Sequence, residues 1–298
     1  MPELPEVERV RLSLIDHLIG RQIVDVSIHR AEVVEFGNVA ARTKAAMQTA
    51  LLRGLTIGEL KRHGKQLAIV AGEVNGVEAE ARVMCIHLGM TGAVVHERVA
   101  LDHSDDGATP QPAGDKHIHL RWHLDSGGSF YFHDPRRFGG VWTFAKQGDL
   151  LTQRWAALGP DALVIQPEDL HARLHETDRH LKAALLDQSV VAGLGNIYVD
   201  ELLFQIGLHP MTRASRVKLN DVHRMVEAMR DLLGRAIASG GSSLRNYVDG
   251  NGNAGAFQFS HQVYGRAGQP CRRCEATLKS KTVGGRTTVF CARCQRKT

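Results

Sequence analysis

The first residues of the chain, MPELPEVE, place a potential secondary amine beside a carboxyl group, since Pro2 precedes Glu3. A free proline amine is a nucleophile, and a neighbouring carboxyl group can transfer protons. The ordinary explanation is a helix start, because proline suits the first helical turn and acids suit the positive end of the helix dipole. A helix start explains Pro5, Glu6 and Glu8, but Pro2 and Glu3 lie ahead of the first turn. The helix start therefore leaves the use of Pro2 and Glu3 unexplained.

Four cysteines near the end of the chain form two close pairs, CRRC at 271–274 and CARC at 291–294. Four thiolates can surround Zn2+ tetrahedrally and leave no open position, so the predicted site is structural. The residues between the pairs alternate like two strands around Gly284 and Gly285, which predicts a zinc-bound hairpin with Arg286 at its tip. The alternative is two redox pairs, but the matched spacing and basic surroundings favour zinc. The expected ligands are Cys271, Cys274, Cys291 and Cys294.

Two further motifs could bind an anion or a nucleic acid. AGLGN at 192–196 puts two glycines before an expected helix N-terminus, where free N–H groups attract anions. Its alternative is an ordinary helix cap at Asn196. HDPRRFGGVW at 133–142 joins two arginines, which can bond bases or phosphates, to Phe138, which can wedge between bases. Its alternative is a surface turn with Phe138 folded into the core.

Length and charge restrict the class of protein. A chain of 298 residues is too long for one small core, so at least two domains are expected. The last 38 residues carry nine basic residues and one acidic residue, and the rest of the chain carries 28 basic and 31 acidic residues. A localised basic segment predicts a polyanionic partner, nucleic acid first, and its alternative is a solvated basic tail.

The location follows from what the sequence lacks. No apolar run is long enough to span a membrane, and the acidic N-terminus does not have the pattern of a signal peptide. Five cysteines in a reducing compartment indicate thiols rather than disulfides, and Cys85, inside an apolar run, is expected to be a buried thiol. We therefore expect a cytoplasmic protein, and a monomer, with no membrane partner.

The pattern of hydrophobic residues divides the chain into three parts. Residues 22–145 alternate short strand-like runs with turns, which predicts a β-sandwich domain over 1–150 with flanking helices. The stretch 101–116 has the composition of a long exposed loop and carries no predicted chemistry. Helical periodicity follows over 151–260, with helices expected at 196–206 and from Asn220 to a stop at Gly240. The zinc hairpin occupies 261–298, so the expected fold class is α+β.

An ordered set of motifs resembles the formamidopyrimidine-DNA glycosylase and endonuclease VIII family. The set is PELPEVE, KRHGK, HLGMTG, DPRRFG, GLGNIYVDELLF, VYGR and the four cysteines, and it runs from Pro2 to the last cysteine pair. Leu4 resembles the formamidopyrimidine branch, since endonuclease VIII members typically carry glycine there. The ordered set is more specific than any one of its motifs.

The resemblance implies a bifunctional DNA glycosylase and abasic-site lyase of base excision repair. Its partner would be double-stranded DNA that contains a damaged base, above all an oxidised purine such as 8-oxoguanine or a formamidopyrimidine. After removal of Met1, the amine of Pro2 would attack C1′ of the damaged nucleotide, expel the base and form a Schiff base whose elimination nicks the strand. An α-amino group titrates near 8, so part of it is free base at neutral pH. Glu3 would transfer the protons.

The resemblance assigns further residues by motif position. Lys65 would contact phosphate near the lesion and belongs with Pro2, Glu3 and Arg286 in the catalytic set; its alternative is a solvated surface lysine. Asn196 and Arg286 would hold phosphates. The remaining residues expected to contact DNA are the three that fill the gap left by the flipped nucleotide and a lysine of the helical domain: Met90, Arg136, Phe138 and Lys182.

Three departures from the family pattern affect the expected substrate. Asn246 stands where aspartate is usual, Ala256 where tyrosine is expected, and Ile118 where the family usually has aspartate. Activity on DNA depends on the catalytic set, which is intact, and the departures bear on the preference for 8-oxoguanine instead. The first alternative is an endonuclease VIII-like preference for oxidised pyrimidines. The second is a non-catalytic damaged-DNA-binding zinc protein, which the presence of Pro2 and Glu3 disfavours.

Overall fold

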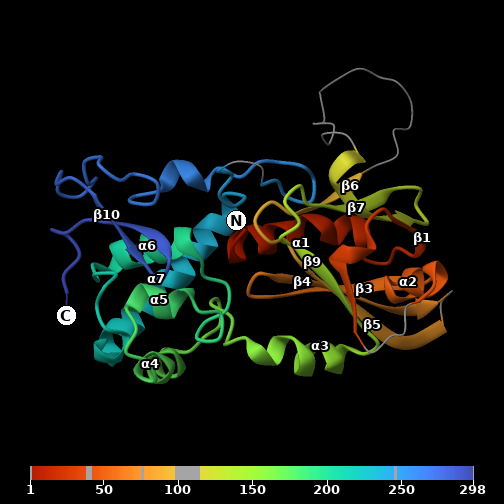
Figure 1. Ribbon diagram of the computed structural model, residues 1–298, viewed down its shortest axis with the longest axis horizontal. Coiled ribbons are helices and arrows are strands. Elements are labelled where there is room, and N and C mark those ends of the chain that lie inside the picture. Colours follow the sequence, from red (N-terminus) through yellow and green to blue (C-terminus); the bar gives the residue numbers. More distant parts are fainter. Residues whose placement is uncertain (1, 38–41, 75–76, 98–114, 245–246, 298) are drawn as a thin grey trace, which may run out of the picture. The chain divides into compact units, whose positions relative to one another are not determined.

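The computed structural model describes residues 2–37, 42–74, 77–97, 115–244 and 247–297 (Figure 1). Packing divides the chain into two compact units. The first contains residues 1–156 together with 240–255, and the second contains 157–239 and 256–298. The chain therefore returns to the first unit for one short segment after the helices of the second. The predicted loop at 101–116 lies almost wholly outside the described residues.

The first unit is built on two β-sheets that share one core. The larger sheet has the strand order β2-β9-β5-β4-β3 and the smaller has the order β1-β7-β8-β6. Neighbouring strands are antiparallel except for β2 and β9, which run parallel. The strands are β1 (Ile23–Ile28), β2 (Val34–Phe36), β3 (Thr56–His63), β4 (Gln66–Val74), β5 (Val77–His87), β6 (Ala93–Glu97), β7 (Ile118–Leu124), β8 (Ser129–His133) and β9 (Gly140–Phe144).

In the described part of this unit, three α-helices accompany the sheets: α1 (Leu4–Leu18), α2 (Lys44–Ala50) and α3 (Gln147–Gln153). The apolar stripe of α1 joins the core, where Val7, Val10, Leu14 and Leu18 are fully buried among residues of both sheets. Spacings of three and four residues put these side chains on one face of the helix. The sandwich therefore fixes α1, and with it the start of the chain.

The second unit is helical and ends in a two-stranded hairpin. Its helices are α4 (Pro167–His175), α5 (Leu181–Leu186), α6 (Asn196–Ile206) and α7 (Leu219–Ala238), and its strands are β10 (Lys279–Val283) and β11 (Arg286–Phe290). Helix α6 is largely buried, and the apolar stripe of α7 includes Val222, Met225, Met229 and Leu233. This architecture confirms the expected α+β class. No helix in the described part of the chain combines the length and apolar character that a membrane span needs.

Candidate catalytic and nucleic-acid-binding site

The start of the chain is buried and held by hydrogen bonds within the first unit. Pro2 is buried, and Glu3, which is 2% exposed, caps helix α1. Glu3 and Glu6 form a capping box, in which the N–H of Glu3 donates to Glu6 Oε2 at 2.8 Å. The second oxygen, Glu6 Oε1, accepts from the N–H of Ser242 at 2.8 Å. One buried carboxylate thus joins the residue beside Pro2 to the returning segment 240–255.

The returning segment lies along one polar face of α1. The hydroxyl of Tyr247 donates to the carbonyl oxygen of Glu6 at 3.1 Å, and burial raises the pKa of that hydroxyl. Further along the helix, the contacts are Arg9 Nε with Asp249 Oδ2 at 3.3 Å, the N–H of Gly250 with Ser13 Oγ at 2.8 Å, and His17 Nε2 with Asn251 Oδ1 at 2.9 Å. The helix residues 6, 9, 13 and 17 follow the spacing of one helix face. The segment is therefore attached to the helix that begins with the candidate catalytic residues.

Lys65 lies between β3 and β4 and is only 8% exposed, which rules out a solvated surface lysine. The next residue, Gln66, pairs with His87 across the sheet. Burial, with the charges of Arg154 and Lys65 adding to it, lowers the pKa of His87 to about 4. His87 Nδ1 accepts from the N–H of Gly89 at 3.2 Å, which puts the proton of the neutral ring on Nε2.

His87 was not among the residues expected from the sequence. It is a neutral hydrogen-bond donor close to a lysine, and it stands in the HLGM motif that supplied only Met90. The only local signal was a histidine directly before a turn. That signal does not indicate a site, because it is the pairing of β4 with β5 that brings His87 near Lys65.

A buried aspartate organises the loop between β8 and β9. The carboxylate of Asp134, which is 0% exposed, accepts from the N–H of Arg136 at 3.3 Å, from the N–H of Gly139 at 2.8 Å and from the hydroxyl of Thr91. The side chain of Phe138 is 55% exposed, so the alternative of a core phenylalanine is wrong. The guanidinium carbon of Arg136 lies 4.7 Å from the Phe138 ring centroid.

The turn that carries Met90 packs directly on this loop. Met90 is 38% exposed. Its neighbour Gly89 has a φ of +60°, and a Cβ there would lie 2.3 Å from the backbone nitrogen of Gly139. Only glycine permits this close approach. The structure therefore brings together the two loops that carry the three residues predicted to fill the gap in the DNA.

In the second unit, the GLGN motif leads into α6 as expected. Gly195 is the helix cap and Asn196 is the first helical residue, so the alternative that Asn196 caps the helix is wrong. Asn196 Nδ2 donates to the carbonyl oxygen of Thr287 on β11 at 3.0 Å, and Asn196 Oδ1 is buried without a hydrogen-bond partner. Arg286 is exposed and stands immediately before Thr287. The two predicted phosphate ligands are thus neighbours across the α6–β11 contact.

Lys182 has a different environment from the one expected of a DNA contact. Its side chain is 0% exposed, and its ammonium donates to Asp200 Oδ1 at 2.7 Å and to the carbonyl oxygen of Thr287 at 3.1 Å. An ammonium sealed in this way cannot reach a phosphate in this conformation, because its donors are already bound to other groups inside the unit. The expectation that Lys182 contacts DNA therefore does not fit its placement.

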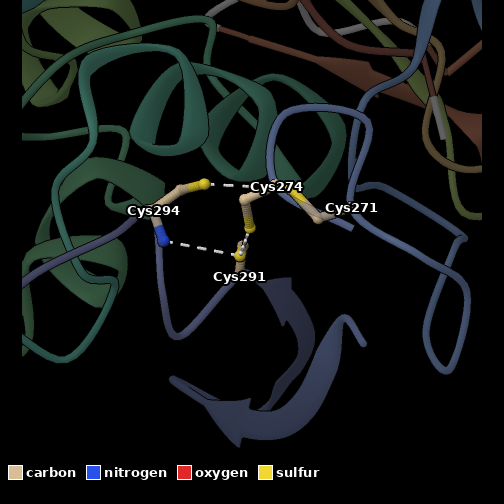
Figure 2. Close-up of side chains that lie close together, drawn as sticks. All are labelled: Cys271, Cys274, Cys291 and Cys294. Atoms are coloured by element: carbon tan, nitrogen blue, oxygen red, sulfur yellow. Dashed lines mark hydrogen bonds between the residues drawn. The ribbon is translucent and has the colours of Figure 1, made fainter. Parts of the chain in front are cut away.

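The four C-terminal cysteines converge (Figure 2), and their sulfur atoms all lie within 4.8 Å of one another. The Sγ atoms of Cys271 and Cys294 are 3.9 Å apart, and those of Cys274 and Cys291 are 3.5 Å apart. A tetrahedral site with Zn–S bonds of about 2.3 Å needs sulfurs separated by about 3.8 Å. The four cysteines therefore form a site suited to one structural zinc ion, with all four positions filled by protein.

Two of the predicted departures can be placed. Ile118 begins β7 and is 3% exposed. Ala256 is exposed, and its N–H donates to the carbonyl oxygen of Ser239 at 2.9 Å. Asn246 lies outside the described residues.

Comparison with known families covers most of the chain. Residues 1–141 match the formamidopyrimidine-DNA glycosylase N-terminal domain, 158–248 match the formamidopyrimidine-DNA glycosylase H2TH domain, and 268–296 match a zinc finger found in FPG and IleRS. The chain belongs to the formamidopyrimidine-DNA glycosylase family. The resemblance drawn from the ordered motifs is thereby confirmed, and so is the structural zinc finger.

Individual relatives match over the full length. The formamidopyrimidine-DNA glycosylase of Bacillus anthracis is 37% identical over 99% of both chains, and that of Solibacter usitatus is 35% identical over 100% of both. The MutM (FPG) protein of Thermus thermophilus superposes with a TM-score of 0.79 at 34% identity, covering 100% of both chains. A mutant of the Lactococcus lactis FPG in complex with DNA that contains Fapy-dG superposes with a TM-score of 0.82 at 30% identity, covering 99% of this chain and 100% of that one.

Proposed function

We propose that this DNA glycosylase of base excision repair removes oxidised purines and then nicks the strand through a Schiff base on Pro2. Its family membership supports the glycosylase activity. The observation that carries the finer proposal is the buried start of α1, where Glu3 stands beside Pro2 and Glu6 holds the Glu3 N–H at 2.8 Å. Such a fixed geometry keeps the nucleophile and the proton-transfer group in constant positions relative to each other.

Two bonds change in the first step, and each has a place in this chain. With Met1 removed, the amine of Pro2 forms a bond to C1′, and the damaged base leaves with the electron pair of the glycosidic bond. Glu3 supplies and removes the protons that this exchange requires. The C1′–O4′ bond then breaks and the sugar ring opens, which leaves the sugar attached to Pro2 as a Schiff base. Loss of a C2′ proton and of the 3′ phosphate from this Schiff base breaks the strand. Because C1′ is not accessible inside a stacked duplex, the nucleotide must first be flipped out.

The two units supply different kinds of DNA contact in this proposal. Lys65 and the neutral His87 hold phosphate near the lesion in the first unit, and Met90, Arg136 and Phe138 fill the gap that the flipped nucleotide leaves. Asn196 and the exposed Arg286 hold phosphates in the second unit. The basic C-terminal segment, with nine basic residues and one acidic residue, supports a polyanionic partner.

Substrate and location complete the proposal. Leu4 supports oxidised purines over oxidised pyrimidines. We place the protein, as a monomer, in the cytoplasm. The compartment follows from the zinc site, because zinc needs four reduced cysteines and a reducing compartment keeps them reduced. Matched duplexes that carry 8-oxoguanine, formamidopyrimidine, thymine glycol or an abasic site separate the two preferences: faster excision of thymine glycol than of either purine lesion contradicts the assignment.

Covalent trapping tests the nucleophile. Borohydride added during reaction with abasic-site DNA reduces the Schiff base, and peptide mass spectrometry should locate the adduct on Pro2 of protein that lacks Met1. The matched control is Glu3→Gln, in which excision of a damaged base should fall by about 100-fold or more because proton transfer is lost. An adduct on Lys65, or trapping by protein that retains Met1, would show that Pro2 is not the nucleophile.

A further inference from the structure

A fully buried ion pair joins helices α5 and α6 in the second unit. The side chains of Lys182 and Asp200 are 0% and 1% exposed, and their Nζ and Oδ1 atoms lie 2.7 Å apart. Burial raises the pKa of Asp200 to about 6, against the lowering effect of the Lys182 charge. Because desolvation offsets much of the attraction between buried charges, such a pair is weak evidence for stability. Its remaining hydrogen bonds indicate another use.

Two further hydrogen bonds of the pair go to the backbone of β11. Lys182 Nζ donates to the carbonyl oxygen of Thr287 at 3.1 Å, and Asp200 Oδ2 accepts from the N–H of Val289 at 3.0 Å. Along a strand, the carbonyl of one residue and the N–H of the residue two positions later point to the same side. The pair therefore holds one edge of β11 by one acceptor and one donor, while the other edge is bonded to β10.

These two hydrogen bonds fix the position of β11 along its own axis relative to α5 and α6. A shift of β11 by one residue would turn these two backbone groups away from the pair and leave both buried charges with an unmade hydrogen bond. Unmade hydrogen bonds at buried charges are costly, so the shifted arrangement is disfavoured. The hairpin turn also lies close to α5, since a Cβ on Gly284 would be 3.1 Å from the Cβ of Ala183, the residue after Lys182.

The fixed strand carries one proposed phosphate ligand and contacts the other. Arg286 directly precedes Thr287, and Asn196 Nδ2 donates at 3.0 Å to the same Thr287 carbonyl that Lys182 holds. Any movement of β11 against α6 would therefore change the separation of Asn196 and Arg286. Neighbouring DNA phosphates have a fixed spacing, so ligands that are set in advance bind them without a further ordering cost.

We infer that the buried Lys182–Asp200 pair is a positioning device that sets the spacing of the phosphate ligands Asn196 and Arg286, and that neither member of the pair touches DNA. The inference rests on the proposed phosphate-binding role of those two residues. It gives Lys182 a task that its burial allows, and it adds Asp200, an acid, to the residues on which DNA affinity depends.

Asp200→Asn gives the sharpest test, because a pure charge effect and a positioning effect predict opposite changes in DNA affinity. Loss of a negative charge from a DNA-binding unit should tighten binding if only charge matters. An amide at 200 instead turns an NH2 donor toward either Lys182 or the Val289 N–H. Either the hydrogen bond that orients Lys182 toward Thr287 or the hydrogen bond to Val289 is then lost. We expect abasic-site duplex to bind about ten- to a hundredfold more weakly. The matched control is Asp231→Asn, which removes an exposed acid of α7 whose side chain is 54% exposed.

A double-mutant cycle with Arg286→Ala separates positioning from a general loss of structure. If the pair acts through Arg286, Asp200→Asn should cost little more in the Arg286→Ala background, so the two effects should be non-additive. Both single variants should lower the slope of log Kd against log salt. The single-turnover excision rate of Asp200→Asn at saturating enzyme should stay close to wild type, because residue 200 touches neither DNA nor the reacting atoms. Zinc content and melting temperature check that each variant is folded. Lys182→Met/Asp200→Leu, which removes both charges, replaces Asp200→Asn if the single variant does not fold.

The outcomes distinguish the inference from the proposed function. If the wild type fails to trap abasic-site DNA, the proposed function fails. If the wild type traps it but a folded Asp200→Asn protein binds as tightly as wild type or more tightly, the positioning device is wrong. It is also wrong if Lys182→Met lowers the salt slope by about 0.9, the value of one phosphate contact, while Asp200→Asn leaves the slope unchanged.

Discussion

The loop between β8 and β9 and the tip of the β10–β11 hairpin both present an arginine to solvent, but they are held in opposite ways. In the loop, the carboxylate of Asp134 binds backbone N–H groups and leaves the side chains of Arg136 and Phe138 exposed. At the hairpin, buried side chains of α5 and α6 hold the backbone of β11.

The difference matches what each part is proposed to do. Residues that fill a gap must move into it when a nucleotide leaves the stack, and the contact between Arg136 and Phe138, worth about 0.5–1 kcal/mol at an exposed site, is weak enough to break. Ligands of backbone phosphates meet the same spacing at every sequence, so they gain from being fixed in advance. The loop between β8 and β9 therefore carries side chains that can move, as gap filling requires. The hairpin carries a ligand whose position is fixed, as phosphate binding favours.

Removal of zinc should have the largest effect, and it acts on the hairpin alone. Structural zinc contributes roughly 10–16 kcal/mol of apparent binding free energy in small modules, so chelation should unfold the hairpin and abolish DNA binding. The first unit has its own core and should keep its β-sheet signal in circular dichroism. Readdition of zinc is the control, and it should restore binding. Stripped protein that still binds DNA would contradict the assigned role of the hairpin.

Asp134→Ala should loosen the loop between β8 and β9, because its backbone loses the carboxylate that holds it. The effect should be smaller than the unfolding of the hairpin on zinc removal. The substitution leaves the part-buried N–H groups of Arg136 and Gly139 without their acceptor. An unmade hydrogen bond costs about 1–3 kcal/mol at a fully buried group, and the cost is smaller here. We expect a lower melting temperature and slower excision, with affinity for undamaged DNA little changed. Asp125→Ala removes an exposed acid of the same unit and serves as the control. Equal losses in excision and in affinity for undamaged DNA would break the comparison between the two parts.

Arg286→Ala should weaken DNA binding to the same extent at every sequence. A phosphate ligand carries no base information, so the slope of log Kd against log salt should fall by about 0.9. Fluorescence anisotropy at several salt concentrations measures this slope, and Arg293→Ala, another exposed arginine of the zinc finger, is the matched control. An unchanged slope would mean that Arg286 does not contact a phosphate.

Arg136→Ala should have the smallest effect on rate and a specific effect on pairing. Cytosine offers two adjacent acceptors to a guanidinium, and adenine offers one acceptor beside an amino donor, so Arg136 should favour lesions opposite cytosine. Without it the C-over-A ratio should narrow by roughly tenfold, about 1.4 kcal/mol. Single-turnover excision of 8-oxoguanine opposite each base measures the ratio. Phe138→Ala is the control and should slow excision opposite both bases alike; an unaltered ratio in Arg136→Ala would make this arginine a phosphate contact.

Sequence reasoning located the elements well where the signal was local. The helix expected at 196–206 is α6, Asn196–Ile206, because a glycine cap and a glycine stop bracket an apolar run. The cysteine spacing predicted the zinc site, because two CxxC pairs can reach one another across a single hairpin. The three-part domain division remains a prediction, since it followed composition, whereas packing gives two units and returns residues 240–255 to the first.

The sequence alone determined the family, the zinc ligands and the candidate nucleophile, because each depends on residue types at short spacings or in a fixed order. The tertiary structure decided which of these side chains is accessible. Lys182 looked like a DNA contact until Asp200, 18 residues away, and Thr287, 105 residues away, were brought against it. Glu6 looked like a helix-dipole acid until Ser242 reached its second oxygen. The burial of Lys182 and of Glu6 depends on residues that are distant in the chain, so no local sequence pattern could have predicted it.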